Sequence, residues 1–208
     1  MSKQRFSYTK EFFRRIAITG WNKSPYFTYS SKYSVLRRWL IAKFSARQKM
    51  VLSIGCGSGE LESALNQQGR KVVGLDICFE MLQTAGRRGL RNLVQGDARN
   101  LPFKSSVFDV VLFPESIGYF ELGPVLAEVA RVLKARGRIL ITAYPTDFAS
   151  DSIYKKRSLQ EIARELNEGG FRVIEQSPLT VSNKSVKPVA SEEYSGLLYV
   201  LAEKKANK

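Results

Sequence analysis

The chain has 208 residues, 44% of them hydrophobic, and its 33 basic and 19 acidic residues give a formal net charge of +14. This length predicts one domain, or one domain with an arm, and no apolar run approaches the roughly 18 residues of a membrane-spanning helix. Two cysteines are too few for a disulfide framework, and with no histidine a metal site is not expected. We therefore expect a cytoplasmic protein. The N-terminus has no long apolar stretch, so we expect no secretory signal.

The basic charge is concentrated at the beginning of the chain. Residues 1–50 hold twelve Lys or Arg and one acid, Glu11, so the first quarter of the sequence carries +11. Aromatic residues are frequent there, and residues 33–46 show helical spacing of apolar side chains. We expect residues 1–49 to form a helical arm of one or two helices packed on the sheet of a catalytic domain over residues 50–208. Such an arm favours an anionic partner, which is a nucleic acid, an anionic membrane surface or an acidic small molecule, unless it serves solubility alone.

After residue 50, strand patterns alternate with helix patterns. This alternation predicts an α/β fold with a Rossmann-like, seven-stranded, mostly parallel sheet and helices on both faces. No helix separates the last two strands, so we expect them to form an antiparallel pair at one edge, joined by a loop. The predicted strands cover residues 50–54, 71–76, 91–97, 106–113, 138–144, 171–181 and 193–204, and the predicted helices cover residues 60–69, 79–89, 122–137 and 158–170.

Three glycines at alternate positions, Gly55, Gly57 and Gly59, follow the first predicted strand. In an open parallel sheet, ligands bind beyond the carboxyl ends of the strands, and glycine there lets a ligand lie against bare backbone. Asp76 closes the second strand, 17 residues after Gly59, near the ~20 expected of an acid that binds ribose hydroxyls. The third glycine comes one residue too early for the dinucleotide motif G-x-G-x-x-G, which argues against NAD.

Five segments then match one family in order and spacing, namely VLSIGCGSG, VVGLDI, QGDARNLPF, FDVVLF and RVLKARGRILIT, over roughly residues 50–144. With them the chain resembles the class I S-adenosylmethionine-dependent methyltransferases, in the ubiquinone/menaquinone-methyltransferase-like (methyltransferase type 11) group. The resemblance implies S-adenosylmethionine as cofactor and S-adenosylhomocysteine as product. Arg136 stands where this family often has glycine, at a turn into the fifth strand, and we expect no functional effect from it.

The resemblance also implies a cofactor site. The loop from Gly55 to Gly59 would lie against the methionine moiety and the ribose, whose hydroxyls Asp76 would bind. Asp97 would accept a hydrogen bond from the adenine amino group, unless either acid only caps a loop or helix. Ile77 would pack on adenine, and Phe113 and Pro114 would line the sulfonium end. The full set of implied cofactor residues is Gly55, Cys56, Gly57, Ser58, Gly59, Asp76, Ile77, Met81, Asp97, Ala98, Phe113 and Pro114, although Cys56 also fits a small buried filler.

The segment after the fourth strand, FPESIGYF over residues 113–120, would face the methyl acceptor. It lacks the N/D-P-P-Y/F segment of amino-group methylases. Glu115 and Ser116 resemble the corresponding pair in methyltransferases of sterols, tocopherols and sugar hydroxyls, where a histidine three residues after the serine can act as base. Here that position is Tyr119, whose usual pKa near ~10 makes it a poorer base. Glu115 and Tyr119 are the candidate catalytic residues, but Glu115 could instead contact the arm or backbone groups, and Tyr119 could pack on the arm.

We therefore expect methyl transfer to a small, apolar or amphiphilic acceptor, such as a quinone precursor or a lipid. The arm would cover the acceptor, residues 144–157 would form another wall, and the basic groups could bring the protein to a membrane. One alternative is an RNA or protein methyltransferase whose arm holds a polyanion, and another is a non-catalytic relative that acts through its arm. The aromatic residues expected to wall the acceptor pocket are Trp21, Tyr26, Phe27, Tyr29 and Tyr33.

Overall fold

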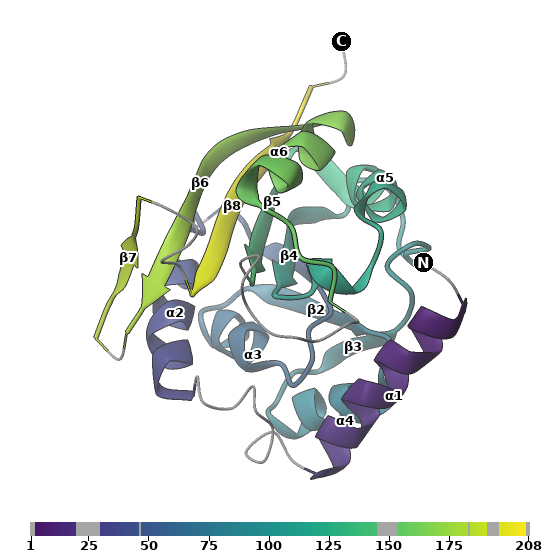
Figure 1. The fold of residues 1–208 in the computed structure, drawn as a ribbon. Coiled ribbons are helices and arrows are strands. Elements are labelled where there is room, and N and C mark those ends of the chain that lie inside the picture. Colours follow the sequence, from purple (N-terminus) through teal and green to yellow (C-terminus); the bar gives the residue numbers. More distant parts are fainter. Residues whose placement is uncertain are drawn as a thin grey trace.

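The strands form one sheet with helices on both faces (Figure 1), in a computed structural model that describes residues 3–19, 30–45, 47–144, 154–182, 184–190 and 196–206. The strand order is β3-β2-β1-β4-β5-β8-β6-β7. The strands are β1 (Met50–Ile54), β2 (Lys71–Asp76), β3 (Asn92–Gln95), β4 (Phe108–Pro114), β5 (Leu133–Ala143), β6 (Phe171–Val181), β7 (Val186–Pro188) and β8 (Leu197–Lys204). The helices are α1 (Lys3–Thr19), α2 (Ser30–Ala42), α3 (Glu60–Gln67), α4 (Phe79–Arg87), α5 (Leu122–Val132), α6 (Leu159–Glu168) and the single 3-10 turn η3 (Ile117–Tyr119).

The predicted α/β class and mostly parallel sheet are confirmed. Strands β1 to β5 pair in parallel, whereas β8 lies antiparallel between β5 and β6. The sheet has eight strands rather than seven, because β7 forms within the expected loop and pairs with the end of β6, from Val181↔Val186 to Leu179↔Pro188. An edge strand is paired on one side only and needs no alternating apolar pattern, so β7 could not be predicted from the sequence pattern.

A second difference lies at the end of α5. The helix was expected to reach Gly137, but it ends at Val132, and β5 begins at Leu133, which pairs with Phe108. Leu133 is fully buried, and Arg136 adopts the left-handed conformation with φ 58°. The helix propensity of residues 133–137 predicted a longer helix, but this preference is weak, and the burial and strand pairing of Leu133 outweigh it.

Two apolar clusters fill the two faces of the sheet. Side chains of α5 and α6, such as Val129 and Ile162, pack on one face. On the other face, α2 and α3 contribute Leu40 and Leu65 to a second cluster. Helices α3, α4 and α6 are each followed, two residues after their last residue, by a glycine with left-handed φ, for example Gly69 at 78°.

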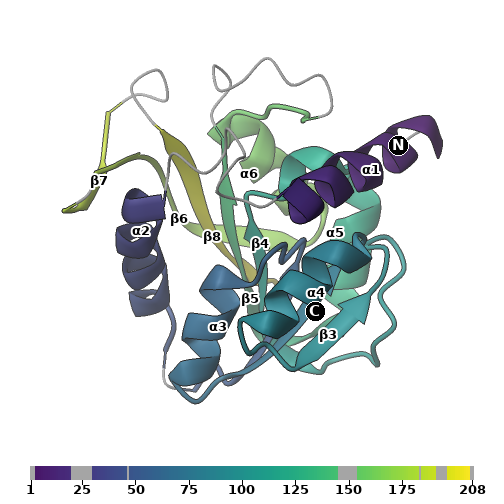
Figure 2. The ribbon, with the colours of Figure 1, turned by 90° about the horizontal axis from the view of Figure 1, so that it is seen from below.

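The two helices of the N-terminal region lie apart, as Figure 2 shows. α1 packs on α4, where Ile16 contacts a small cluster with Cys78 and Met81, and α2 packs near β6, β7 and α3. No helix within the described residues is both long and apolar enough to cross a membrane. The side chains of Trp21, Tyr26, Phe27, Tyr29 and Tyr33 lie outside those that the structure describes, as do residues 145–153 of the second expected wall.

Candidate functional site

The carboxyl ends of β1 and β4 meet at the point where the strand order reverses. β1 pairs in parallel with β2 on one side and with β4 on the other, and the chain leaves β1 toward β2. Loops that follow neighbouring strands in opposite directions leave a crevice between them, and this is where open α/β sheets bind ligands. The loop after β1 holds the three glycines, and the loop after β4 holds Glu115 and Ser116.

Each of the three glycines has a left-handed backbone, with φ of 71° at Gly55, 52° at Gly57 and 73° at Gly59. A Cβ on Gly55 would lie 2.5 Å from the Cβ of Ser116, and one on Gly59 would lie 2.9 Å from the Cβ of Ala85. A Cβ on Gly57 would meet nothing within 4 Å. Gly55 and Gly59 are thus required by close packing as well as by φ, whereas Gly57 presents bare backbone to open space.

The carboxylate of Asp76 holds this loop in place. One of its oxygens accepts a hydrogen bond from the Gly57 N–H at 2.9 Å, and the other accepts from the Cys78 N–H at 2.9 Å. Burial raises the pKa of Asp76, and these backbone N–H groups act in the opposite direction. Each carboxylate oxygen has a second lone pair, so the group can accept further hydrogen bonds from ligand hydroxyls while it orders the loop.

A second buried acid, Glu62, lies behind the loop and was missed by the sequence analysis. It is 1% exposed on α3, and it accepts a 2.6 Å hydrogen bond from the Ser53 hydroxyl of β1. Burial is the main cause that raises its pKa to about 7, and the charges of Glu115 and Asp76 add to the effect. The available signal was Ser53, a polar residue inside an otherwise apolar strand that needed a buried partner.

Glu115 has a strained backbone, with φ 54° at a residue that is not glycine. Its N–H donates to the Thr142 carbonyl at 3.0 Å, and its carboxylate accepts from the Thr142 hydroxyl at 2.9 Å. Burial raises the pKa of this carboxyl to about 7, and the charge of Glu60 contributes. Residues held in such sparsely populated conformations cluster at active sites. Glu115 thus combines an unusual backbone conformation with a buried carboxyl of raised pKa that Thr142 holds in place.

The neighbouring residues of this loop are packed. Ser116 donates a 2.6 Å hydrogen bond to the Ile54 carbonyl and so joins the end of β4 to β1. The Tyr119 ring makes edge contacts with Phe13 of α1, at a centroid distance of 5.0 Å, and with Tyr154, at 5.1 Å. Tyr119 therefore packs against α1 and belongs to an aromatic wall beside Glu115.

The structure places the remaining predicted cofactor residues around the same strand ends. Asp97 follows β3 and pairs with Arg99, whose backbone N–H and side-chain Nε donate to it at 2.9 and 3.0 Å, and this pairing lowers the pKa of Asp97. Phe113 is fully buried and belongs to the apolar cluster on one face of the sheet. Burial raises the pKa of the Cys56 thiol, which fits a filler rather than a nucleophile. Cys56, Ser58, Met81 and Ala98 are buried, and Ile77 and Pro114 are partly exposed.

The site contains acids but no metal-binding cluster. Among the described residues, no group of three or more His, Cys, Asp or Glu could hold a metal ion. Asp76 and Glu115 lie at the strand ends that flank the crevice, and Glu62 is buried behind the glycine loop, so these acids suit a ligand with positive charge. Their arrangement fits S-adenosylmethionine, which carries a sulfonium, an amino group and ribose hydroxyls.

Comparison with known proteins agrees with this geometry. A family model described as a methyltransferase domain matches residues 52–141. The demethylmenaquinone methyltransferase of Corynebacterium kroppenstedtii is 35% identical over 97 residues, which are 46% of this chain and 42% of that protein. The fatty-acid O-methyltransferase of Mycolicibacterium smegmatis is 38% identical over 120 residues, which are 54% of this chain and 43% of that protein. The chain spans about half the length, or less, of the curated relatives that it matches first.

Among solved structures, the fold resembles a methyltransferase of Haloferax volcanii in complex with the Trm112 methyltransferase activator. The TM-score is 0.77 at 22% identity, over 93% of this chain and 98% of the other. At this identity the likeness concerns the fold.

Proposed function

This chain belongs to the class I S-adenosylmethionine-dependent methyltransferases, and we propose that it transfers a methyl group from that cofactor to a small, apolar or amphiphilic acceptor. The single observation that carries the proposal is the loop at the switch point. There the Asp76 carboxylate accepts a hydrogen bond from the Gly57 N–H at 2.9 Å, and the space beside the Gly57 Cα is open. A cofactor with a ribose and a cationic sulfur would find there bare backbone, a hydroxyl-binding carboxylate and a negative surrounding.

The residues of this chain would hold the cofactor as follows. The backbone of residues 55–59 would lie against the methionine moiety, and Asp76 would accept from the ribose hydroxyls. Asp97, shared with Arg99, would face the adenine end. When bound, the cofactor supplies an electrophilic methyl group on a sulfonium, so much of the catalysis is positioning of the acceptor in line with it.

We assign the proton transfer to Glu115. An acceptor that is methylated on a hydroxyl oxygen or on an activated ring carbon must lose a proton, whereas an ionised carboxylate need not. A carboxyl with a pKa of about 7 is well matched to take that proton near neutral pH. Thr142 orients the carboxylate through the 2.9 Å hydrogen bond. Tyr119, packed between Phe13 and Tyr154, would contact the acceptor rather than ionise.

An apolar or amphiphilic acceptor is supported by two observations. The aromatic wall of Phe13, Tyr119 and Tyr154 continues to Tyr144 at the end of β5, with a centroid distance of 5.6 Å between Tyr154 and Tyr144. Relatives at 35% and 38% identity carry names that refer to a quinone and to fatty acids. Aromatic and apolar linings are what sites for such molecules usually have.

The outer surface of α1 supports contact with an anionic membrane. Tyr8 and Ile18 are 57% and 63% exposed, and the exposed Arg14 and Arg15 lie on the same helix. Apolar groups beside basic groups on one helix favour the interface of an anionic bilayer, where such acceptors reside.

The first test is isothermal titration of the protein with S-adenosylmethionine and S-adenosylhomocysteine. We expect micromolar binding by the wild type and by Glu168→Ala, an exposed acid on α6, and loss of at least about tenfold in affinity for Asp76→Ala, which removes charge-assisted hydrogen bonds. Absence of binding by the wild type would refute the proposal.

The second test is mass spectrometry of methylated products. A prenylated naphthoquinol, a long-chain fatty acid and a transfer RNA are offered in parallel, with anionic vesicles in a separate binding assay. Methylation of either lipid-like acceptor supports the proposal. Methylation of the RNA, together with steeply salt-dependent binding, would assign the basic arm to a polyanion instead. Cofactor binding without any product would favour the non-catalytic alternative.

A further inference from the structure

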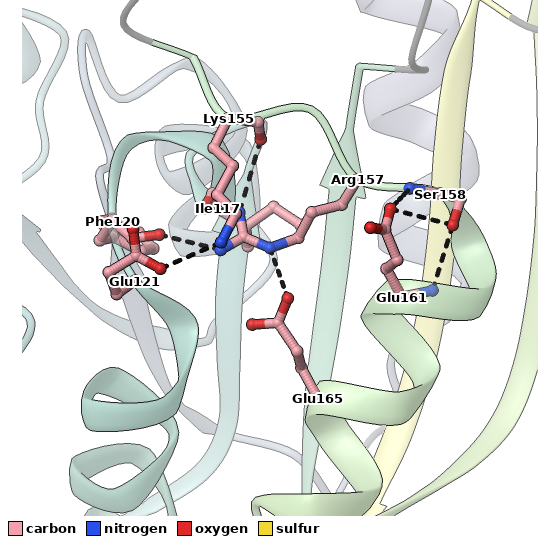
Figure 3. Close-up of polar contacts among 8 residues, drawn as sticks. All are labelled: Ile117, Phe120, Glu121, Lys155, Arg157, Ser158, Glu161 and Glu165. Carbon is pink, nitrogen blue, oxygen red and sulfur yellow. Dashed lines mark hydrogen bonds and ion pairs between the residues drawn. The ribbon is translucent and has the colours of Figure 1, made fainter.

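Arg157 is buried at the acceptor side of the site. The residue is 2% exposed, and its guanidinium makes an ion pair with Glu165 of α6, with 2.8 Å between Nε and Oε1 (Figure 3). Its other nitrogens donate to the carbonyl oxygens of Ile117, at 2.9 Å, and Phe120, at 3.1 Å. One side chain therefore joins α6 to both ends of the η3 turn.

The residues just before Arg157 hold the middle of the same turn. The Lys155 N–H donates to the Gly118 carbonyl at 2.7 Å. The Tyr154 ring covers Gly118 so closely that a Cβ on this glycine would overlap the ring. The Tyr154 hydroxyl in turn accepts from the Tyr144 N–H at 3.2 Å, at the end of β5. Residues 154–157 thus form a strap over η3, and Arg157 is its buried anchor.

The turn that this strap holds carries the acceptor side of the proposed active site. Glu115 and Ser116 lead into η3, and Tyr119 ends it. Ser116 is bonded to Ile54 and packed on Gly55, so a shift of η3 would reach both the proton acceptor and the glycine loop. Glu115 has a strained backbone that must be held from outside, since it would otherwise relax.

We propose that Arg157 is a positioning residue, which fixes the segment from Glu115 to Phe120 against the cofactor loop and thereby sets the geometry of the acceptor. This inference rests on the proposed function. The planar guanidinium is suited to the task because its donors project in fixed directions from three nitrogens to a carboxylate and two carbonyls, whereas a lysine ammonium offers its donors from one atom. Burying a charge is costly, and such groups are retained where they specify one conformation.

The chain contains a matched control in Arg131. Its guanidinium also binds a carboxylate, Glu128, at 2.7 Å, and two carbonyls, Phe103 at 2.6 Å and Leu101 at 2.9 Å. These carbonyls belong to the segment that leads into β4, at the opposite end of that strand from Glu115. The two arginines therefore share their hydrogen-bonding chemistry and differ in the loop that they hold and in exposure, since the Arg131 side chain is 36% exposed and that of Arg157 is 1% exposed.

The test compares Arg157→Lys with Arg131→Lys by hydrogen exchange and kinetics. The Tyr119 N–H, bonded to the Ser116 carbonyl at 3.1 Å, and the Lys155 N–H report opening of η3. We expect both amides to exchange at least about tenfold faster in Arg157→Lys and to be unchanged in Arg131→Lys. With the acceptor that the wild type methylates, Arg157→Lys should lower kcat/KM about 10- to 100-fold, as misplacement near 1 Å does. Its affinity for S-adenosylhomocysteine should stay within about twofold.

A second variant separates misplacement from an unpaired charge. In Arg157→Met/Glu165→Gln the buried ion pair is removed on both sides, so global stability is less affected, but η3 loses its anchor. We expect the same faster exchange and the same kinetic defect. Equal losses in the Arg131→Lys control, or unchanged exchange of Tyr119 in both Arg157 variants, would overturn the inference. The exchange experiment needs no acceptor, so it decides the anchoring separately from the proposed activity.

Discussion

The Cβ of Ser116 lies 2.5 Å from where a Cβ on Gly55 would stand, so the loops after β1 and β4 are packed backbone against side chain at the switch point. The 2.6 Å hydrogen bond from the Ser116 hydroxyl to the Ile54 carbonyl fixes the same contact. The cofactor side and the acceptor side of the proposed site are therefore in direct contact, and a substitution in one loop should alter the position of the other.

Alanine at Gly55 should cost more stability than alanine at Gly57. Both residues have left-handed φ, which costs alanine about 1–2 kcal/mol. Gly55→Ala adds the overlap with Ser116, so we expect a total loss of about 2–4 kcal/mol in the free energy of unfolding. Gly57→Ala has no overlap and should lose only the first amount, but it should weaken S-adenosylhomocysteine binding. Urea denaturation and calorimetric titration of both variants measure this, and equal stability of the two would contradict it.

Glu62→Gln should make the protein more stable at alkaline pH. Burial raises the pKa of Glu62 from 4.5 to about 7, so the folded state binds this proton more tightly than the unfolded state does. Stability from this group is therefore highest below pH 4.5, falls as the pH rises toward 7 and stays low above it. Glutamine still accepts from Ser53 but never ionises. The variant should gain about 2–3 kcal/mol over wild type at pH 8, relative to their difference at pH 4.5, at about 1.4 kcal/mol per pKa unit.

Denaturation curves of the Glu62 pair at several pH values test this sign. Glu168→Gln, an exposed position on α6, is the control and should follow the wild type. A stability difference that is constant with pH would show that Glu62 does not titrate in this range.

Glu115→Gln should abolish most methyl transfer and leave the fold intact. Glutamine keeps an oxygen for the Thr142 hydroxyl but cannot take a proton, and loss of a general base costs about 10²–10⁴-fold in rate. The wild-type rate should rise with pH through about 7, as the Glu115 carboxyl ionises, and this dependence should vanish in the variant. Steady-state rates of both proteins should be measured from about pH 5.5 to about pH 8.5, a range that extends roughly 1.5 pH units to either side of that pKa. A rate that is unaffected by the substitution would remove Glu115 from the mechanism.

Arg136→Gly should stabilise the protein without altering activity. Arg136 has φ 58° at the turn into β5, a conformation that costs about 1–2 kcal/mol except for glycine. Glycine loses about 0.5–1 kcal/mol to its greater freedom when unfolded, so the net gain should be about 0.5–1 kcal/mol. Arg136→Ala relieves no backbone strain and is the control. Thermal denaturation of both variants, side by side with methyl transfer, measures the effect, and destabilisation by glycine would show that the arginine side chain outweighs the strain.

The positions of the glycine loop and of the acid at the end of β2 could be predicted because their causes are local. Their places follow from the sequence, since Gly57 lies in the loop after one recognisable apolar strand and Asp76 is the last residue of the next. The order of strands and helices, the left-handed glycine ends of the helices and the basic N-terminal region are likewise written in short stretches of residues. Each depends on neighbours a few positions away.

The features that the sequence did not reveal depend on contacts between distant segments. Glu62 looks like one of several helical acids until Ser53 and the loop enclose it, and its raised pKa exists only in that enclosure. Arg157 reads as one of many basic residues, yet packing of η3 on α6 buries it. The end of α5 and the edge strand β7 were likewise decided by pairing across the sheet. Sequence thus determined the frame and the glycine loop, whereas burial and long-range pairing, which only the tertiary structure creates, decided which charged groups are enclosed beside that loop.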